Sequence, residues 1–190
     1  MLSAWDKDIK GSRADYIRLL ISEGADVNAN DNDGKTPLMF AKSPEIVTLL
    51  IEAGADVDFR DKIGYTPLLT ASQDSTTPEI FTLLIAAGAD VNAKTERGWT
   101  PLMVAARHST IPEIVTRLIE AGADVNAREI TDSTPLMFAA RNSSTPEIVT
   151  LLLENGAKIE ARDSVGMTPL RFATRSPEII QILKAAGARE

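Results

Sequence analysis

The chain has 190 residues, 44% of them hydrophobic, and a net charge of −7. This acidic balance argues against a nucleic-acid backbone or an anionic membrane as the main partner. The chain has no cysteine, which excludes disulfide bonds and thiolate metal sites, and no apolar run approaches the roughly 18 residues of a membrane span.

Two short motifs recur along the chain. Thr-Pro-Leu occurs at 36–38, 66–68, 100–102, 134–136 and 168–170, and a Gly-Ala pair follows an apolar run six times, at steps of 30, 34, 34, 34 and 31 residues. Repeats of this length predict a stacked array. We expect one domain over 1–190. Its units are an N-terminal cap at 1–29, repeats at 30–59, 60–93, 94–127 and 128–161, and a C-terminal cap at 162–190.

The N-terminal unit is only half present. Residues 15–21 have the pattern of a second helix but no Thr-Pro-Leu precedes them, so residues 1–29 predict a capping unit in which Trp5 packs instead of binding. Residues 1–10 contain three charged residues by position 8 and lack the apolar stretch of a secretory signal. We therefore expect a cytoplasmic protein.

The first helix of each repeat begins at the Thr-Pro-Leu motif. In residues 94–127, Thr100 suits an N-cap, Pro101 the first helical position, and the apolar run 102–106 a short buried helix. The units at 30–59 and 162–190 lack residues between their two helices. They should have a first helix nearly one turn shorter, or a tighter loop.

The second helix of each repeat has a polar row. Thr110 and Glu113 fit a capping box, and Gly122 suits the left-handed position after the helix. Glu113, Thr116 and Glu120 are spaced by 3 and 4, so one face should meet solvent while the apolar remainder packs on both neighbouring units. At the end of the array, Arg171 and Lys184 replace apolar residues, as an uncovered terminal unit requires.

The second repeat carries a family signature. It reads Asp61-x-x-Gly64-x-Thr66-Pro67-Leu68, then Ala71, Glu79-Ile80 and Leu83-Leu84, then Gly88-Ala89-Asp90-Val91-Asn92-Ala93. This pattern resembles the ankyrin repeat. The resemblance implies an all-α fold, an α-solenoid of helix-turn-helix units with projecting β-hairpin fingers. It also implies protein–protein binding through the finger tips and the concave face of the inner helices.

The chain departs from the family pattern at two kinds of position. The family's usual histidine after Thr-Pro-Leu is replaced by Met39, Leu69, Met103, Met137 and Arg171. The hydrogen bonds of that histidine must therefore be lost or replaced. Asp132 stands where the other fingers have a glycine, and we expect it to tolerate a positive φ.

Candidate binding residues lie in the finger columns that vary between repeats. Tyr65, Trp99 and Arg97 form the predicted centre, because tryptophan, tyrosine and arginine are preferred interface anchors. The flanking residues at other finger positions are Ile63, Ile130, Val165 and Met167. The alternative is that the two aromatic side chains only cover the backbone of neighbouring fingers.

Cations recur at the start of successive repeats, at Arg60, Lys94, Arg128 and Arg162. They predict an anchor for an acidic partner. The alternative is local compensation by Asp61, Glu129 and Asp163, which follow them directly. Arg107 and His108, at the end of an inner helix, are expected surface contacts. His108 is the only histidine, so neither a catalytic role nor a metal site is expected for it.

No nucleophile set, phosphate loop or dinucleotide motif appears in the chain. We predict a non-catalytic module, without cofactor, that binds an unidentified protein partner as a monomer. Nucleic acid, membrane and small-molecule substrate are not expected partners. Two alternatives remain open, namely a self-associating structural scaffold, and an engineered or reconstructed repeat protein without a selected partner.

Overall fold

The computed structural model describes residues 12–74, 77–142 and 144–189, and in these residues every regular element is a helix. The helices are α1 (Arg13–Ser22), α2 (Pro37–Phe40), α3 (Pro44–Glu52), α4 (Pro67–Asp74), α5 (Pro78–Ala86), α6 (Pro101–His108), α7 (Pro112–Glu120), α8 (Pro135–Asn142), α9 (Pro146–Glu154), α10 (Pro169–Phe172) and α11 (Pro177–Ala185). Trp5 lies outside the described residues.

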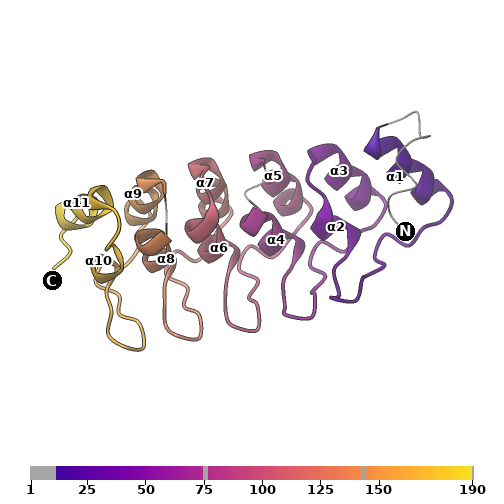
Figure 1. Ribbon diagram of the computed structural model, residues 1–190. Helices are drawn as coiled ribbons and strands as arrows, with labels where there is room; N and C mark the ends of the chain where they lie inside the picture. Colours follow the sequence, from indigo (N-terminus) through magenta and orange to yellow (C-terminus); the bar gives the residue numbers. More distant parts are fainter. Residues whose placement is uncertain (1–11, 75–76, 143, 190) are drawn as a thin grey trace.

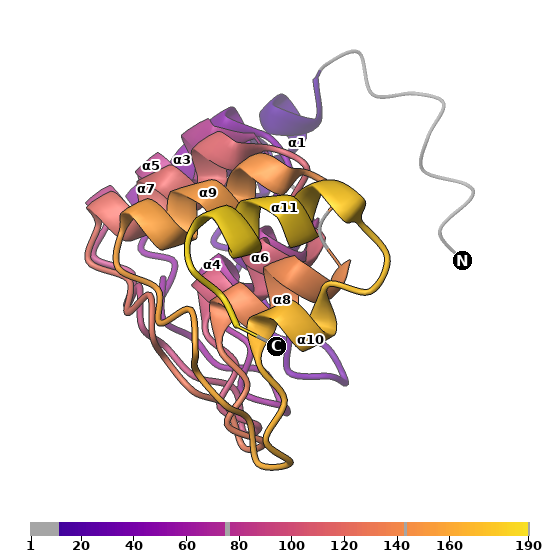
Figure 2. The same cartoon turned by 90° about the vertical axis from the view of Figure 1, so that its left-hand side faces the viewer.

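The helices form two parallel rows. Figure 1 shows the outer helices α1, α3, α5, α7, α9 and α11 side by side, with the inner helices α2, α4, α6, α8 and α10 in a second row. Loops between units project beyond the inner row, and Figure 2 shows them overlying one another when the array is viewed along its length. The predicted all-α solenoid is confirmed.

The projecting loops are the predicted fingers, but they differ from β-hairpins. The structure assigns no β-strand among residues 12–74, 77–142 and 144–189. Each finger closes instead through a short turn, as in the third, where Gly98 N–H donates to the Thr95 carbonyl at 2.9 Å and Thr95 N–H to the Trp99 carbonyl at 3.0 Å. Two such bonds are too few to make a strand ladder.

The inner helices of the two short units are shorter than the other inner helices, as predicted. α2 and α10 have four residues each, whereas α4, α6 and α8 have eight. Four residues are slightly more than one helical turn. The residues missing from the units at 30–59 and 162–190 therefore shorten the inner helix and leave the outer helix at its full nine residues.

Proline begins every helix from α2 to α11, because proline at the first position loses no intrahelical hydrogen bond. The residue directly before the proline is therefore the N-cap, and the predicted capping box at Thr110 and Glu113 is wrong. Ile111 is the N-cap of α7 and gives no side-chain bond. Ser43 and Ser176 do cap α3 and α11 through their hydroxyls, each at 3.3 Å.

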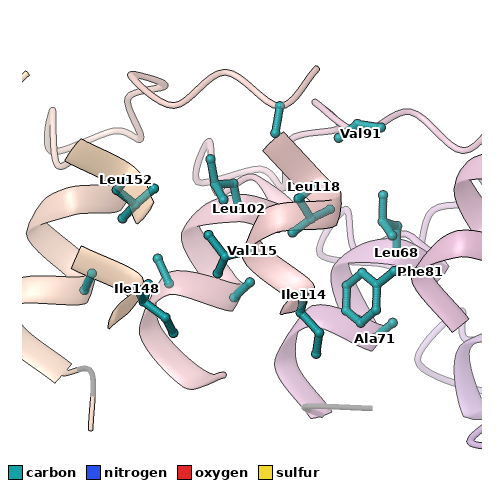
Figure 3. Packing of buried hydrophobic residues seen from close by; sticks show 14 of the residues in the cluster. Leu68, Ala71, Phe81, Val91, Leu102, Ile114, Val115, Leu118, Ile148 and Leu152 are labelled. Atoms are coloured by element: carbon teal, nitrogen blue, oxygen red, sulfur yellow. The ribbon is translucent and has the colours of Figure 1, made fainter. Parts of the chain in front are cut away.

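One apolar core runs through the stacked units. Figure 3 shows side chains from neighbouring units meeting between the two helical rows, among them Phe81, Ile114, Leu118 and Ile148. All four are at most 1% exposed. In the outer helices the predicted glutamate row faces solvent, and at the last unit Arg171 and Lys184 are exposed as expected.

Side chains on the loops after the outer helices tie each unit to the next. The Asn92 amide donates to the Gly122 carbonyl at 3.0 Å and accepts from Asp124 N–H at 2.8 Å. Asn28 and Asn126 each make the same pair of bonds to the unit that follows them. Asp58, in the equivalent place, only accepts, from Asp90 N–H at 2.9 Å. None of the described helices has the length and apolar character needed to cross a membrane.

Candidate partner-binding groove

Each finger is held in shape by the side chain at its base. Asp61 Oδ1 accepts hydrogen bonds from the backbone N–H groups of Ile63 and Tyr65, at 3.0 and 2.8 Å. Asp31, Glu129 and Asp163 do the same in their fingers, and Thr95 Oγ1 accepts from Trp99 N–H at 3.1 Å. A fixed finger places the residues at its tip and stem at repeatable positions.

Neighbouring fingers are joined by one backbone hydrogen bond each. The N–H groups of Lys62, Glu96, Ile130 and Ser164 donate to carbonyls at the tip of the preceding finger, at 2.9 to 3.3 Å. Asp132 has the expected positive φ, 61°, in the fourth finger. Three of the tips carry an apolar side chain open to solvent, since Ile63, Ile130 and Val165 are 58%, 67% and 79% exposed.

A groove with a volume of about 510 Å³ separates the second and third fingers from the inner helices. We call it the finger groove. It is lined by Ile63, Tyr65, Gln73, Thr95, Glu96, Arg97, Trp99, Val104, Arg107 and His108. Six residues predicted from the sequence therefore come together in one place. Ile130, Val165, Met167, Arg60, Lys94 and Arg128 do not line the finger groove.

Trp99 has a packing role as well as an exposed edge. Its ring lies against Phe138 of the next unit, with centroids 4.3 Å apart, and against the small cluster of Leu69, Ala93 and Val104. The Arg107 guanidinium lies 5.3 Å from the centre of the same ring. The half-buried ring therefore packs on its neighbours and also lines the finger groove, and its role in binding stays a prediction.

Tyr65 is the second aromatic residue of the groove, and it is half-buried. Burial raises the pKa of its phenol, and the carboxylate of Asp61 adds to that rise while Arg107 opposes it. The phenol is therefore neutral at physiological pH and available as a hydrogen-bond donor.

A second hollow of about 400 Å³ continues the finger groove toward the N-terminal end. It shares Ile63, Tyr65 and Gln73 with the finger groove and adds Phe40, which is 56% exposed. Sequence reasoning missed Phe40 and Gln73, and in the finger groove it also missed Thr95, Glu96 and Val104. The available signal was the inner-helix column Phe40, Thr70, Val104, Phe138 and Phe172, which varies in size as a contact surface does.

Comparison with known protein families agrees with this architecture. The sequence model described as ankyrin repeats, in three copies, matches residues 9–61, 42–129 and 112–189. The chain belongs to the ankyrin repeat family. Ankyrin repeats are generally protein–protein interaction modules. A search of curated proteins found no match to the chain.

In some ankyrin units of this chain, where the family's usual histidine is replaced, the threonine hydroxyl of Thr-Pro-Leu has no partner among the described residues. The hydroxyls of Thr36, Thr134 and Thr168 are buried and make no hydrogen bond within the described residues. Thr66 and Thr100 accept instead from the N–H three residues on, each at 3.3 Å. The histidine's bonds are thus lost in three units and replaced by a local cap in two.

Two cations of the predicted basic column, Arg60 and Arg128, bind the backbone of the next ankyrin unit, whereas Arg162 donates to the Gly166 carbonyl of its own finger at 3.0 Å. Arg60 donates to the Lys94 carbonyl at 2.6 Å, and Arg128 to the Arg162 carbonyl at 3.0 Å, so each guanidinium reaches the same position of the next repeat. Arg128 also pairs with Asp132 at 3.4 Å. Asp61, Glu129 and Asp163 were expected to compensate the charge of these cations. Their carboxylates instead accept hydrogen bonds from backbone N–H groups of the fingers.

His108 lies at the end of α6 with its side chain exposed. Partial burial and the neighbouring charge of Arg107 lower its pKa, so it is neutral at physiological pH. Within the described part of the chain, no three His, Cys, Asp or Glu residues gather closely enough to hold a metal ion.

Another hollow of the array lies between α1, α2 and α3. Its volume is about 630 Å³, and its lining is mostly apolar, including Ile17, Leu20, Phe40, Ile46 and Leu50. It occupies the place where the repeat pattern would put an inner helix before α1. Residues 1–11, which precede α1, lie outside the described residues.

Proposed function

We propose that this ankyrin repeat domain, over 1–190 with the unit boundaries given above, is a non-catalytic module that binds a protein partner in the finger groove. The observation that carries the proposal is the convergence of Ile63, Tyr65, Arg97 and Trp99 with Arg107 and His108 around one hollow. Aromatic and arginine side chains in a partly desolvated groove are the usual anchors of protein interfaces. The proposal places Ile130, Val165 and Met167 at the edge of the contact.

The binding surface is built on a rigid base, which supports this role. Asp61 fixes the second finger and Thr95 fixes the third. Phe138 and Arg107 hold the ring of Trp99 in place. Side chains that are already ordered lose little conformational entropy when a partner binds. We place the protein in the cytoplasm as a monomer without cofactor or small-molecule substrate.

The test must separate binding from folding, because Trp99 also packs. We would compare Ile63→Ala with Leu19→Ala, since both side chains are apolar and exposed and only Ile63 lines the groove. A partner captured from the source cell should bind Ile63→Ala at least about fivefold more weakly than wild type, because groove contacts that matter contribute ~1 kcal/mol or more. Leu19→Ala should bind like wild type. Equal binding of both variants would remove the groove as the site.

Self-association is the second candidate, and the row of exposed apolar tips at Ile63, Ile130 and Val165 favours it. Exposed apolar patches often mark contact surfaces. Sedimentation of the chain at micromolar concentration distinguishes the two. A stable dimer that Ile130→Asp disrupts would support the scaffold, whereas a monomer at all concentrations would support binding to another protein.

A further inference from the structure

Charge is divided between the two helical rows of the array. The outer helices, α1 included, contain eight glutamates and Asp15 against four cations, Arg13, Arg18, Arg117 and Lys184. The inner helices contain the single carboxylate Asp74 against three arginines. A chain with a net charge of −7 thus turns its negative side outward and keeps an excess of positive charge beside the fingers.

Three exposed arginines lie in the groove or in the unit beside it. Arg97, Arg107 and Arg141 are exposed, and none of them forms an ion pair with a described carboxylate. Arg107 lies over the Trp99 ring at 5.3 Å, and Arg141 over the Phe172 ring at 5.8 Å. Stacking on a ring orders an arginine while leaving its N–H edges available to a carboxylate.

The acidic groups on the same side do not cancel this charge. Glu96 lines the finger groove beside the two arginines. In the adjoining hollow, Asp74 pairs with Lys42 at 2.9 Å, and Asp61 accepts two finger N–H groups. The cationic excess therefore begins at the third unit, with Arg97 and Arg107, and continues to Arg141.

We propose that the finger groove binds an extended acidic segment of a protein partner. Carboxylates of that segment bind Arg97, Arg107 and Arg141. An apolar residue of the same segment packs over Tyr65 and Trp99. This rests on the proposed function and names the chemistry of the partner. Arg107 and Arg141 hold equivalent positions in adjacent units, which lie about one helix diameter, ~10 Å, apart. An extended chain rises ~3.3 Å per residue, so acidic residues three apart would meet successive arginines.

The experiment uses the full chain and a library of random 12-residue peptides displayed on phage. Peptides selected on the immobilised protein would be synthesised, labelled and measured by fluorescence anisotropy. We expect them to be rich in Asp and Glu around an apolar residue. Their affinity should fall as salt rises, since the attraction is between exposed charges.

Three variants test which cations are involved. Arg107→Gln should lower the affinity for a selected peptide at least about fivefold. Arg141→Gln should lower the affinity for those peptides that have a second acidic residue three positions away. Lys158→Gln is the matched control, because it removes one exposed cation from the loop after α9, away from the groove. It should leave the affinity unchanged. Urea unfolding of each variant checks that the fold is retained.

The outcomes separate this inference from the proposed function. Neutral or basic selected peptides that lose affinity on Ile63→Ala would keep the groove as a binding site and overturn the acidic partner. Selected peptides whose affinity is unchanged by Ile63→Ala, Arg97→Gln and Arg107→Gln would overturn both proposals, the groove as the binding site and the acidic partner. Salt-sensitive self-association that Arg107→Gln abolishes would show that the acidic outer row of a second copy occupies the groove, and would also overturn the peptide proposal.

Discussion

Replacing Asp58 by asparagine should stabilise the array. Asn28, Asn92 and Asn126 each use both ends of the amide to join two units, whereas Asp58 accepts from Asp90 N–H and has no N–H to give to the Gly88 carbonyl. The Gly88 carbonyl follows the end of α5, where the helix dipole disfavours a negative charge. Asp58→Asn adds the missing donor and removes that charge.

The magnitude follows from the bonds that the asparagines make. Asn126 donates to the Gly156 carbonyl at 2.9 Å and accepts from Lys158 N–H at 2.8 Å. A net hydrogen bond contributes about 0.5–1.5 kcal/mol, and exposed ones lie at the low end. We therefore expect Asp58→Asn to raise the free energy of unfolding by ~0.5–1 kcal/mol, Asn126→Asp to lower it by a similar amount, and Asn126→Ala to lower it by ~1–2 kcal/mol.

Urea unfolding followed by circular dichroism measures these changes, with the slope checked for constancy. Asp56→Asn is the control for net charge, because the Asp56 carboxylate bonds only within its own loop, to Asp58 N–H at 2.9 Å. If Asp58→Asn left the unfolding midpoint unchanged, or if Asp56→Asn raised it equally, the amide donor would not be the group that joins the units.

Three further predictions concern the groove and the units. Burial and Arg107 hold the pKa of His108 below its usual 6.5, so the unfolded chain binds the proton more readily. Stability should fall as pH drops below about 6.5, and urea unfolding of His108→Gln at pH 7.5 and 5 should show a smaller fall. Met137→His should stabilise the protein by ~0.5–1.5 kcal/mol, because Met137 Sδ lies 3.4 Å from Thr134 N–H beside an unpaired hydroxyl; a matched gain from Met137→Leu would contradict this. Gly98 and Gly166 both have positive φ, but a Cβ at Gly98 would lie 3.1 Å from the Glu129 backbone and one at Gly166 would meet open space. Gly98→Ala should therefore cost ~1 kcal/mol more than Gly166→Ala, and equal midpoints in thermal unfolding would refute the clash.

Trp99 illustrates why binding and stability are hard to separate in this array. Its ring contacts Phe138 of the next unit and covers Val104 of its own. Removing it would weaken the stacking of two units as well as the groove. The exposed residues Ile63 and Arg97 line the same groove without lying in the core, so they give the cleaner test of recognition.

The sequence alone determined the repeating framework. Proline at the start of helices α2 to α11 and the glycine after Ala121 follow from backbone preferences within one repeat. The short inner helices follow from the residues missing in the two short units. Arg171 and Lys184 likewise marked an uncovered end, because hydrophobic periodicity shows which positions must be buried. Ile63, Tyr65, Arg97 and Trp99 were found because their finger columns vary where the framework does not. Arg107 and His108 were found from their position at the end of an inner helix.

Only the tertiary structure decided which side chains meet across units. Arg60 reaches a carbonyl 34 residues away, Asn126 joins two loops, and Trp99 packs on Phe138 of the next unit. These contacts depend on the distance and rotation between stacked units, and no local pattern encodes either quantity. Gln73, Glu96 and Val104 therefore entered the groove unpredicted, because a groove is a property of the surface between elements.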